Sequence, residues 1–264
     1  HGERHRRPYI VISALASVSS GNCFYVANKD AAILIDAGIS AKQTLQRLQS
    51  INENPAKLKG IFITHEHIDH VRGADVLARK LNIPIFATKS TIHAISLCSN
   101  KELINCIKSN GVIKIRGLKI EAFSKDHSAA DPVSFNIYEN KKISIITDAG
   151  HACKNIQKNV SDCNLLCIEA NHDEEMLENG PYPYFLKKWI SSDQGHLSNK
   201  QAALCVLEYA SSRLNRIILS HLSQTNNTPE TALSTFTSII NQRQNFNPEI
   251  TLSVRDNPTS LFKI

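Results

Sequence analysis

Apolar residues along the chain fall into two kinds of run. Short continuous runs rich in β-branched residues are typical of strands buried on both faces, whereas apolar positions spaced three or four apart are typical of helices with one buried face. The continuous runs predict strands at 9–16, 23–27, 32–35, 60–64, 84–87, 112–115, 118–123, 133–138, 142–147, 165–169, 216–220, 249–254 and 260–262. Helices are predicted after the N-cap Ser40, through 76–81, around 92–97, from the cap Ser198 to 211, and over 229–242 after Thr228.

The predicted strands recur in two halves of the chain, on either side of helices. Two mixed sheets packed face to face, with the helices outside, would bury all the continuous runs. We therefore predict an α/β fold, the four-layer αββα sandwich, with residues 9–264 as a single domain of two pseudo-equivalent halves. Residues 1–8 are basic and start without methionine, so we expect a mobile arm, a processing product or an artificial remnant outside the fold.

One predicted strand runs into a concentration of metal-binding side chains. Directly after 60–63 come Thr64, His65, Glu66, His67, Ile68, Asp69 and His70. The end of a buried strand is where open α/β folds place their sites. In such a loop the first two histidines can turn toward one point, while the aspartate and the third histidine start a helix and face a neighbouring point. Imidazole and carboxylate ligands without thiolates suit zinc, manganese or iron. A solvated turn would explain one or two of these residues, so we predict a loop that serves two cations.

Three later residues stand just beyond other predicted strands. His127 follows 118–123, Asp148 ends 142–147 and His221 ends 216–220. Each of them alone is as consistent with a hydrogen-bonded residue at a sheet edge. Together with the loop they would converge at one rim of the sandwich and bring the set to five histidines and two aspartates, about the number that two metals need.

The pattern H-x-H-x-D-H after a buried strand, followed by these three residues, resembles the ordered motifs of the metallo-β-lactamase superfamily, and Asp36 matches the first motif. This resemblance implies one metal held by His65, His67 and His127. It implies a second metal held by Asp69, His70 and His221, with Asp148 as the bridge. Asp36, together with Thr64, would orient the histidine loop from behind.

Two further segments, Glu169-Ala170-Asn171-His172-Asp173 and Gly195-His196-Leu197-Ser198-Asn199, are similar to those of the YycJ/WalJ-type hydrolases of that superfamily. The resemblance implies a 5′-to-3′ exonuclease-like phosphodiesterase, acting on DNA in preference to RNA. Its cofactors would be two divalent ions, zinc or manganese with iron as a third candidate, which share a hydroxide nucleophile. The chain departs from the family pattern at Val18, Ser128 and Trp189.

The same resemblance implies roles beyond metal binding. Asp69 and Asp148 would be catalytic as well as ligating, and His196 would stabilise or protonate the leaving oxygen. Substrate contacts are expected from Asn171, His172, Ser198 and Lys187. His196 could instead be a structural helix-edge residue. Lys187, Lys188 and Trp189 could contact a backbone and stack a base, although a solvated helix face with one core tryptophan is the favoured interpretation.

Two other functions remain open at this point. One is a small-molecule phosphodiesterase or thioesterase of the same fold, and the other is an iron-bearing redox protein of the superfamily. A net charge of +6 weakly favours a polyanionic partner, and a homodimer is compatible with the sequence. The seven cysteines are scattered through apolar segments, which suggests free thiols in a reducing compartment. Since no apolar run is long enough to span a bilayer, we expect a cytoplasmic protein without a membrane partner.

Overall fold

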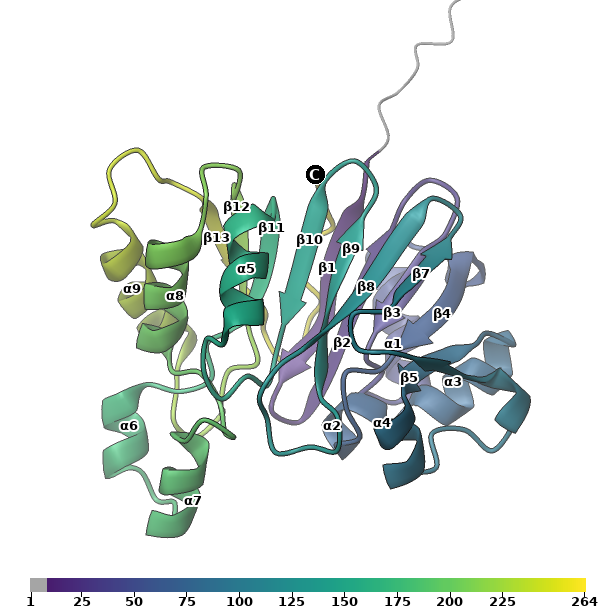
Figure 1. Ribbon diagram of the computed structural model, residues 1–264, viewed down its shortest axis with the longest axis horizontal. Helices are drawn as coiled ribbons and strands as arrows, with labels where there is room; N and C mark the ends of the chain where they lie inside the picture. Colours follow the sequence, from purple (N-terminus) through teal and green to yellow (C-terminus); the bar gives the residue numbers. More distant parts are fainter. Residues whose placement is uncertain (1–8) are drawn as a thin grey trace, which may run out of the picture.

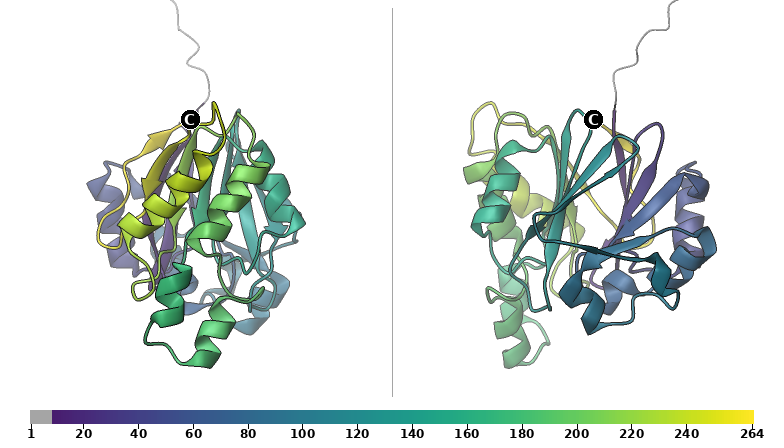
Figure 2. Two further views of the ribbon diagram at one scale, coloured as in Figure 1. Left: turned by 90° about the vertical axis from the view of Figure 1, so that its left-hand side faces the viewer. Right: turned by 45° about the vertical axis from the view of Figure 1, so that its right-hand side comes forward.

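The computed structural model describes residues 9–264, so the expectation for residues 1–8 lies outside the described part of the chain. Two mixed sheets of seven strands face each other, and helices cover both outer faces (Figures 1 and 2). The predicted αββα sandwich is confirmed.

The first sheet has the strand order β14-β1-β2-β3-β4-β5-β6. Its first three pairings, from β14 to β3, are antiparallel, and the remaining three are parallel. The strands are β1 (Val11–Val18), β2 (Gly21–Ala27), β3 (Ala32–Ile35), β4 (Leu58–Phe62), β5 (Ile85–Thr88), β6 (Ile104–Ile107) and β14 (Phe262–Lys263).

The second sheet has the order β7-β8-β9-β10-β11-β12-β13. It repeats the same series, three antiparallel pairings followed by three parallel ones. By this series β3 corresponds to β10 and β4 to β11. The strands are β7 (Val112–Ile115), β8 (Leu118–Ser124), β9 (Val133–Tyr138), β10 (Lys142–Ile146), β11 (Leu165–Glu169), β12 (Arg216–Ser220) and β13 (Glu249–Leu252).

The helices pack through apolar faces onto the two sheets. Leu48 and Leu77 belong to the apolar cluster on the outer face of the first sheet, and Val206 and Phe236 to that on the second. A third cluster, which includes Phe24 and Phe135, fills the space between the sheets. The helices are α1 (Ala41–Ser50), α2 (Ile68–Val71), α3 (Ala74–Leu81), α4 (Lys89–Ala94), α5 (Lys154–Asp162), α6 (Glu174–Asn179), α7 (Tyr184–Ile190), α8 (Asn199–Tyr209) and α9 (Pro229–Ile240), with 3₁₀ turns at Pro55–Lys57 and Lys101–Leu103.

Several boundaries differ from the predictions. The first hairpin turns at Ser19 and Ser20 alone, because the strands stay paired out to Val18 and Gly21. The helix expected around 92–97 begins earlier, since the side chain of Thr88 caps it. The pattern also missed β6, α5 and α6 and gave no bounds for α7; these elements are short, and several carry only one or two buried residues.

The parallel strands of both sheets end at the same side of the sandwich, away from the C-terminus (Figure 1). Helices α6 and α7 project beyond that side from the connection between β11 and α8 (Figures 1 and 2). Throughout residues 9–264, every helix is too short or too polar to cross a membrane.

Candidate metal centre

The histidine loop after β4 is held from behind by Asp36, a buried residue at the end of β3. Its Oδ1 accepts a hydrogen bond from the backbone N–H of Thr64 (2.8 Å), and its Oδ2 accepts one from the Thr64 hydroxyl (2.8 Å). The same Oδ2 lies 2.7 Å from Nδ1 of His70. A proton on that nitrogen leaves Nε2 of His70 free to face the centre. Asp36 and Thr64 therefore have the orienting positions expected of them.

The loop itself places its side chains in two directions. Nε2 of His65 is 3.0 Å from Nδ1 of His67, so these two rings point at the same space. The chain then enters α2, with His67 at its N-cap. Within that short helix Oδ2 of Asp69 lies 3.3 Å from Nε2 of His70. His65 and His70 also approach one another, with ring centroids 4.1 Å apart, so the division of the loop between two cations stays a prediction.

The second sheet supplies single residues from the ends of separate strands. Nδ1 of His127, beyond β8, donates to the carbonyl oxygen of Gly195 (3.0 Å). Nδ1 of His221, after β12, lies 3.1 Å from Oε2 of Glu169. Both rings are thereby fixed with Nε2 toward the centre. These two Nε2 atoms and Oδ2 of Asp148 are buried without a hydrogen-bond partner. Buried polar atoms rarely lack partners, so three converging ones fit a place for cations.

Asp148 lies between the two sets of histidines. Its Oδ2 is 3.1 Å from Nε2 of His70, and its Oδ1 is 3.5 Å from Nε2 of His221 and 3.9 Å from Nε2 of His127. Ligand atoms within 4.8 Å of one another form four overlapping groups: His65, His67 and His127; Asp69, His70 and His221; His65, His70 and Asp148; and Asp148, Glu169, His196 and His221. All seven residues predicted as ligands are therefore brought together.

The backbone at three of these positions is in the left-handed region. Asp36, Asp148 and His221 have φ values of 61°, 51° and 56°. Such conformations are uncommon for residues other than glycine, and they occur preferentially at functional sites, where the surrounding structure holds them. Each of the three follows the end of a buried strand, so the turn directs the side chain into the space between the sheets.

The charges within the centre are unevenly divided. Burial lowers the pKa of His65 well below its ordinary value and lowers the pKa of His127 to about 4. Burial also opposes a charge on His221, but the carboxylates of Asp148, Asp69 and Glu169 raise its pKa to about 10. The pKa of His70 is also raised, since carboxylates outweigh burial. His65 and His127 are thus neutral rings with a lone pair available for a metal. His70 and His221 are surrounded by carboxylates, whose negative charge favours a cation in that part of the centre.

Glu169 is the residue that the predictions missed. It is fully buried at the end of β11, and its Oε2 lies 3.1 Å from Nδ1 of both His196 and His221. Its Oε1 accepts hydrogen bonds from the backbone N–H groups of Ala149 and Leu197. Although burial favours its neutral form, the nearby histidines lower its pKa to about 2. A glutamate ending an otherwise apolar strand was the available signal.

His196 stands beside the predicted ligands. Its Nδ1 is 3.6 Å from Oδ1 of Asp148, and its ring centroid is 5.2 Å from those of both His127 and His221. Its side chain is 13% exposed, more than those of His127 and His221. His196 therefore lies at the edge of the candidate centre, and its role on a leaving oxygen stays a prediction.

The four predicted substrate contacts have different surroundings. Nδ2 of Asn171 donates to the carbonyl of His221 (3.0 Å). Ser198 is buried and caps α8; its hydroxyl also donates to Glu174 (2.9 Å). Nζ of Lys187 donates to the backbone oxygen of Glu178.

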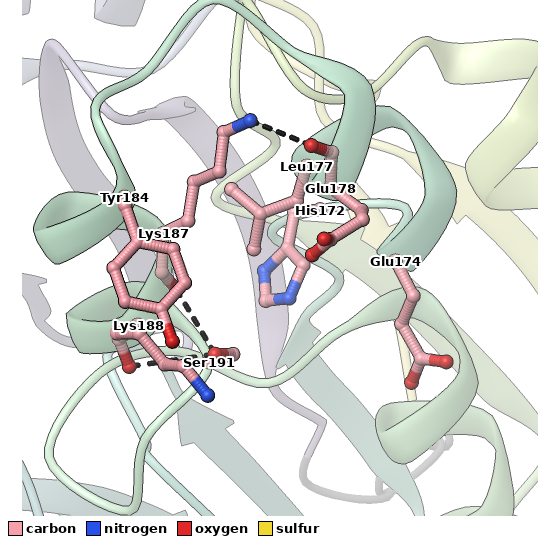
Figure 3. Close-up of a pocket in the computed structure, with 8 residues that line it drawn as sticks. All are labelled: His172, Glu174, Leu177, Glu178, Tyr184, Lys187, Lys188 and Ser191. Carbon is pink, nitrogen blue, oxygen red and sulfur yellow. Dashed lines mark hydrogen bonds between the residues drawn. The ribbon is translucent and has the colours of Figure 1, made fainter.

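His172 is buried, and burial lowers its pKa to about 4. Its imidazole lines a cavity of about 210 Å³ between α6 and α7 (Figure 3). The structure thus sets His172 apart from the metal ligands, in a separate pocket next to the centre.

The comparisons with known proteins agree with this architecture. Residues 31–222 match the family described as the Beta-lactamase superfamily domain. The chain is 34% identical over 238 residues to exodeoxyribonuclease YycJ of Bacillus anthracis, covering 88% of this chain and 89% of that protein. It is 36% identical over 239 residues to exodeoxyribonuclease WalJ of Streptococcus pneumoniae, covering 87% and 88%.

Among solved structures, the metallo-β-lactamase fold protein YhfI from Bacillus subtilis superposes with a TM-score of 0.73. It covers 98% of this chain and 99% of that one at 13% sequence identity, which is a likeness of fold. The chain therefore belongs to the β-lactamase superfamily, in the branch that contains the YycJ and WalJ proteins.

Proposed function

We propose that this protein is a metal-dependent phosphodiesterase that removes nucleotides from the 5′ end of DNA, with two divalent cations in its centre. The observation that carries the proposal is the convergence of three buried, unpartnered ligand atoms, on His127, Asp148 and His221, between two groups of histidines. The relatives named as exodeoxyribonucleases, similar over most of the chain, support the choice of substrate.

When bound, zinc or manganese would supply positive charge and a water that ionises near neutral pH. His65, His67 and His127 would hold one ion, and Asp69, His70 and His221 the other. Asp148 lies within 4 Å of histidines from both groups and would bridge the ions. Asp36 and Glu169 hold the Nδ1 atoms of His70 and His221, which fixes the ring nitrogens that face the cations.

His196 acts on the leaving oxygen. The Glu169 carboxylate lies 3.1 Å from its Nδ1 and orients the ring. The other ring nitrogen is then left for a contact with a phosphoryl or leaving oxygen. Asp69 lies 3.8 Å from Nε2 of His221 and is less buried than Asp148, a position from which it can orient the attacking water as well as ligate.

Metal analysis combined with a cleavage assay tests the proposal. We expect two divalent ions per chain in active protein, loss of activity with a chelator, and release of 5′ mononucleotides from end-labelled DNA faster than from RNA of the same sequence. Zero or one ion in fully active protein would overturn the two-metal assignment. Turnover of bis-nitrophenyl phosphate without cleavage of any oligonucleotide would favour a small-molecule phosphodiesterase, and iron with oxygen-dependent chemistry would favour a redox protein.

A further inference from the structure

Helix α7 carries an unusual amount of exposed aromatic surface. Tyr184 is 73% exposed, Phe185 is 74% exposed and Trp189 is 37% exposed. The tryptophan is therefore not the core residue that the sequence favoured. In the described part of the chain the other exposed large apolar residues are aliphatic and stand on different elements. Large aromatic faces left in water on one short helix suggest a binding surface.

The aromatic surface is continuous with the candidate metal centre. The Trp189 ring centroid lies 5.7 Å from that of His196, at an interplanar angle of 84°, and 6.2 Å from that of His127. Phe185 is four residues earlier in the helix, so its side chain lies on the same face about one turn farther out. Trp189 thus borders the centre, and Phe185 lies one turn away along α7, which projects beyond the sandwich (Figure 1); we call these two residues the aromatic strip.

The charge on this helix favours a polyanion. Helix α7 contains Lys187 and Lys188 and has no acidic residue. Nζ of Lys188 lies 5.5 Å from the Tyr184 ring centroid. Lys187 instead fastens α7 to α6 through the backbone of Glu178 (Figure 3). Lys188, which directly precedes Trp189 in the helix and also borders the cavity between α6 and α7, is the second cation of α7.

The cavity between α6 and α7 is less suited to a phosphate. The carboxylates of Glu174 and Glu178 line it opposite Lys187 and Lys188, so acidic groups offset the two lysines there, and its buried His172 has a lowered pKa. We therefore assign the base contacts to Phe185 and Trp189, neither of which lines this pocket, and the backbone contact to Lys188, which borders it.

We propose that Phe185 and Trp189, flanked by Lys188, form a stacking platform for unpaired bases of a single DNA strand whose terminal phosphodiester lies at the metal centre. This inference rests on the proposed function and adds the substrate class, a single-stranded end. Aromatic side chains bind single strands by stacking on base faces, with little sequence preference, while cations follow the backbone. In a duplex these faces are covered by neighbouring base pairs, so the platform would discriminate against paired ends.

The only tryptophan of the chain makes the test direct, since its fluorescence reports on stacking at Trp189. Metal-loaded full-length protein is titrated with a phosphorothioate-linked oligothymidylate, which resists cleavage, with an abasic oligomer of equal length, and with a blunt duplex. We expect saturable quenching by the oligothymidylate and little by the other two. Phe185→Ala should weaken binding of the oligothymidylate about 5- to 150-fold, the range measured for loss of one stacked base.

Leu233→Ala is the matched control, because it removes a 36% exposed apolar side chain from α9; its binding should equal that of the parent. Equal quenching by the abasic oligomer or the duplex, or parental affinity in Phe185→Ala, would overturn the platform. So would a change in sedimentation of Phe185→Ala without a change in DNA binding, which would identify a protein contact. The binding and cleavage assays test different proposals. Base-dependent quenching without DNA cleavage would refute the proposed function alone. DNA cleavage without base-dependent quenching would refute the platform alone.

Discussion

The two sheets repeat one series of strand pairings, yet they serve the centre differently. Asp36 ends β3 and Asp148 ends β10, the corresponding strand of the other sheet; both are buried and both have left-handed backbones. The oxygens of Asp36 are occupied by Thr64 and His70. Oδ2 of Asp148 has no hydrogen-bond partner and lies among histidine nitrogens. The residue after the corresponding strand therefore supports histidines in one sheet and faces the candidate metal centre in the other.

The next strand of each sheet explains the difference. After β4 the chain forms a loop with three histidines within six residues, and such a loop needs a carboxylate behind it. The corresponding strand β11 ends in Glu169, which takes the supporting role through His196 and His221. Asp148 is thereby left free to face the centre. The supporting carboxylate thus follows β3 in one half, whereas in the other half it ends β11, the strand next to the one that corresponds to β3.

Of the two corresponding aspartates, Asp148, which faces the centre, should have the largest effect on activity when it is replaced. We expect Asp148→Ala to lower kcat/KM by more than any other ligand substitution, and by more than the roughly 10²- to 10⁴-fold lost with a positioned acid. It removes the residue shared by both cation sites and leaves their charges less neutralised. Steady-state cleavage of end-labelled DNA and metal content per chain measure this. Full metal content with near-parental activity would show that Asp148 does not bridge.

Removing the residue supported by Glu169 tests the proposed chemistry. His196→Ala should retain the metals and the fold but cleave DNA roughly 10²- to 10⁴-fold more slowly. The loss should shrink with bis-nitrophenyl phosphate, whose leaving group departs without a proton. His93→Ala, which changes an exposed histidine on α4, is the control and should match the parent. Loss of metal in His196→Ala would instead identify the residue as part of the cation site.

Exchanging the supporting carboxylates for amides sharpens the comparison. Asp36→Asn and Glu169→Gln keep the shape of each side chain but weaken the acceptor opposite a histidine Nδ1. Groups of this kind usually contribute 10- to 100-fold in metal affinity or activity. We expect both variants in that range, with Asp36→Asn acting through metal affinity at the His70 side. Glu169→Gln should also lower kcat at saturating metal, because it touches His196. Identical metal affinity and kcat in both variants would contradict a division of roles.

Sequence patterns predicted the first sheet's contribution better than the second's. Three histidines within six residues are visible as a cluster, and buried strands on both sides of that cluster fix its place. His127, Asp148 and His221 could be found from strand ends and family resemblance, since they are far apart in the chain. Glu169 escaped because a glutamate at the end of an apolar strand is a weak signal until the fold shows which rings it meets. The bounds of the short helix α7 were not predicted because aromatic residues, which favour strands, make up much of it.

The smallest expected effect concerns two helix caps that repeat across the halves. Ser40 before α1 and Ser198 before α8 each form a capping box with a glutamine three residues later. Replacing either by alanine should lower the free energy of unfolding by about 1 kcal/mol, as measured by urea denaturation. Ser161→Ala, at an exposed position inside α5, is the control and should change it by less than about 0.5 kcal/mol.

If the Ser198 hydroxyl is needed only for the cap and for Glu174, Ser198→Ala leaves the KM for DNA unchanged. A raised KM with parental stability would show that this hydroxyl contacts substrate, as the family resemblance implies.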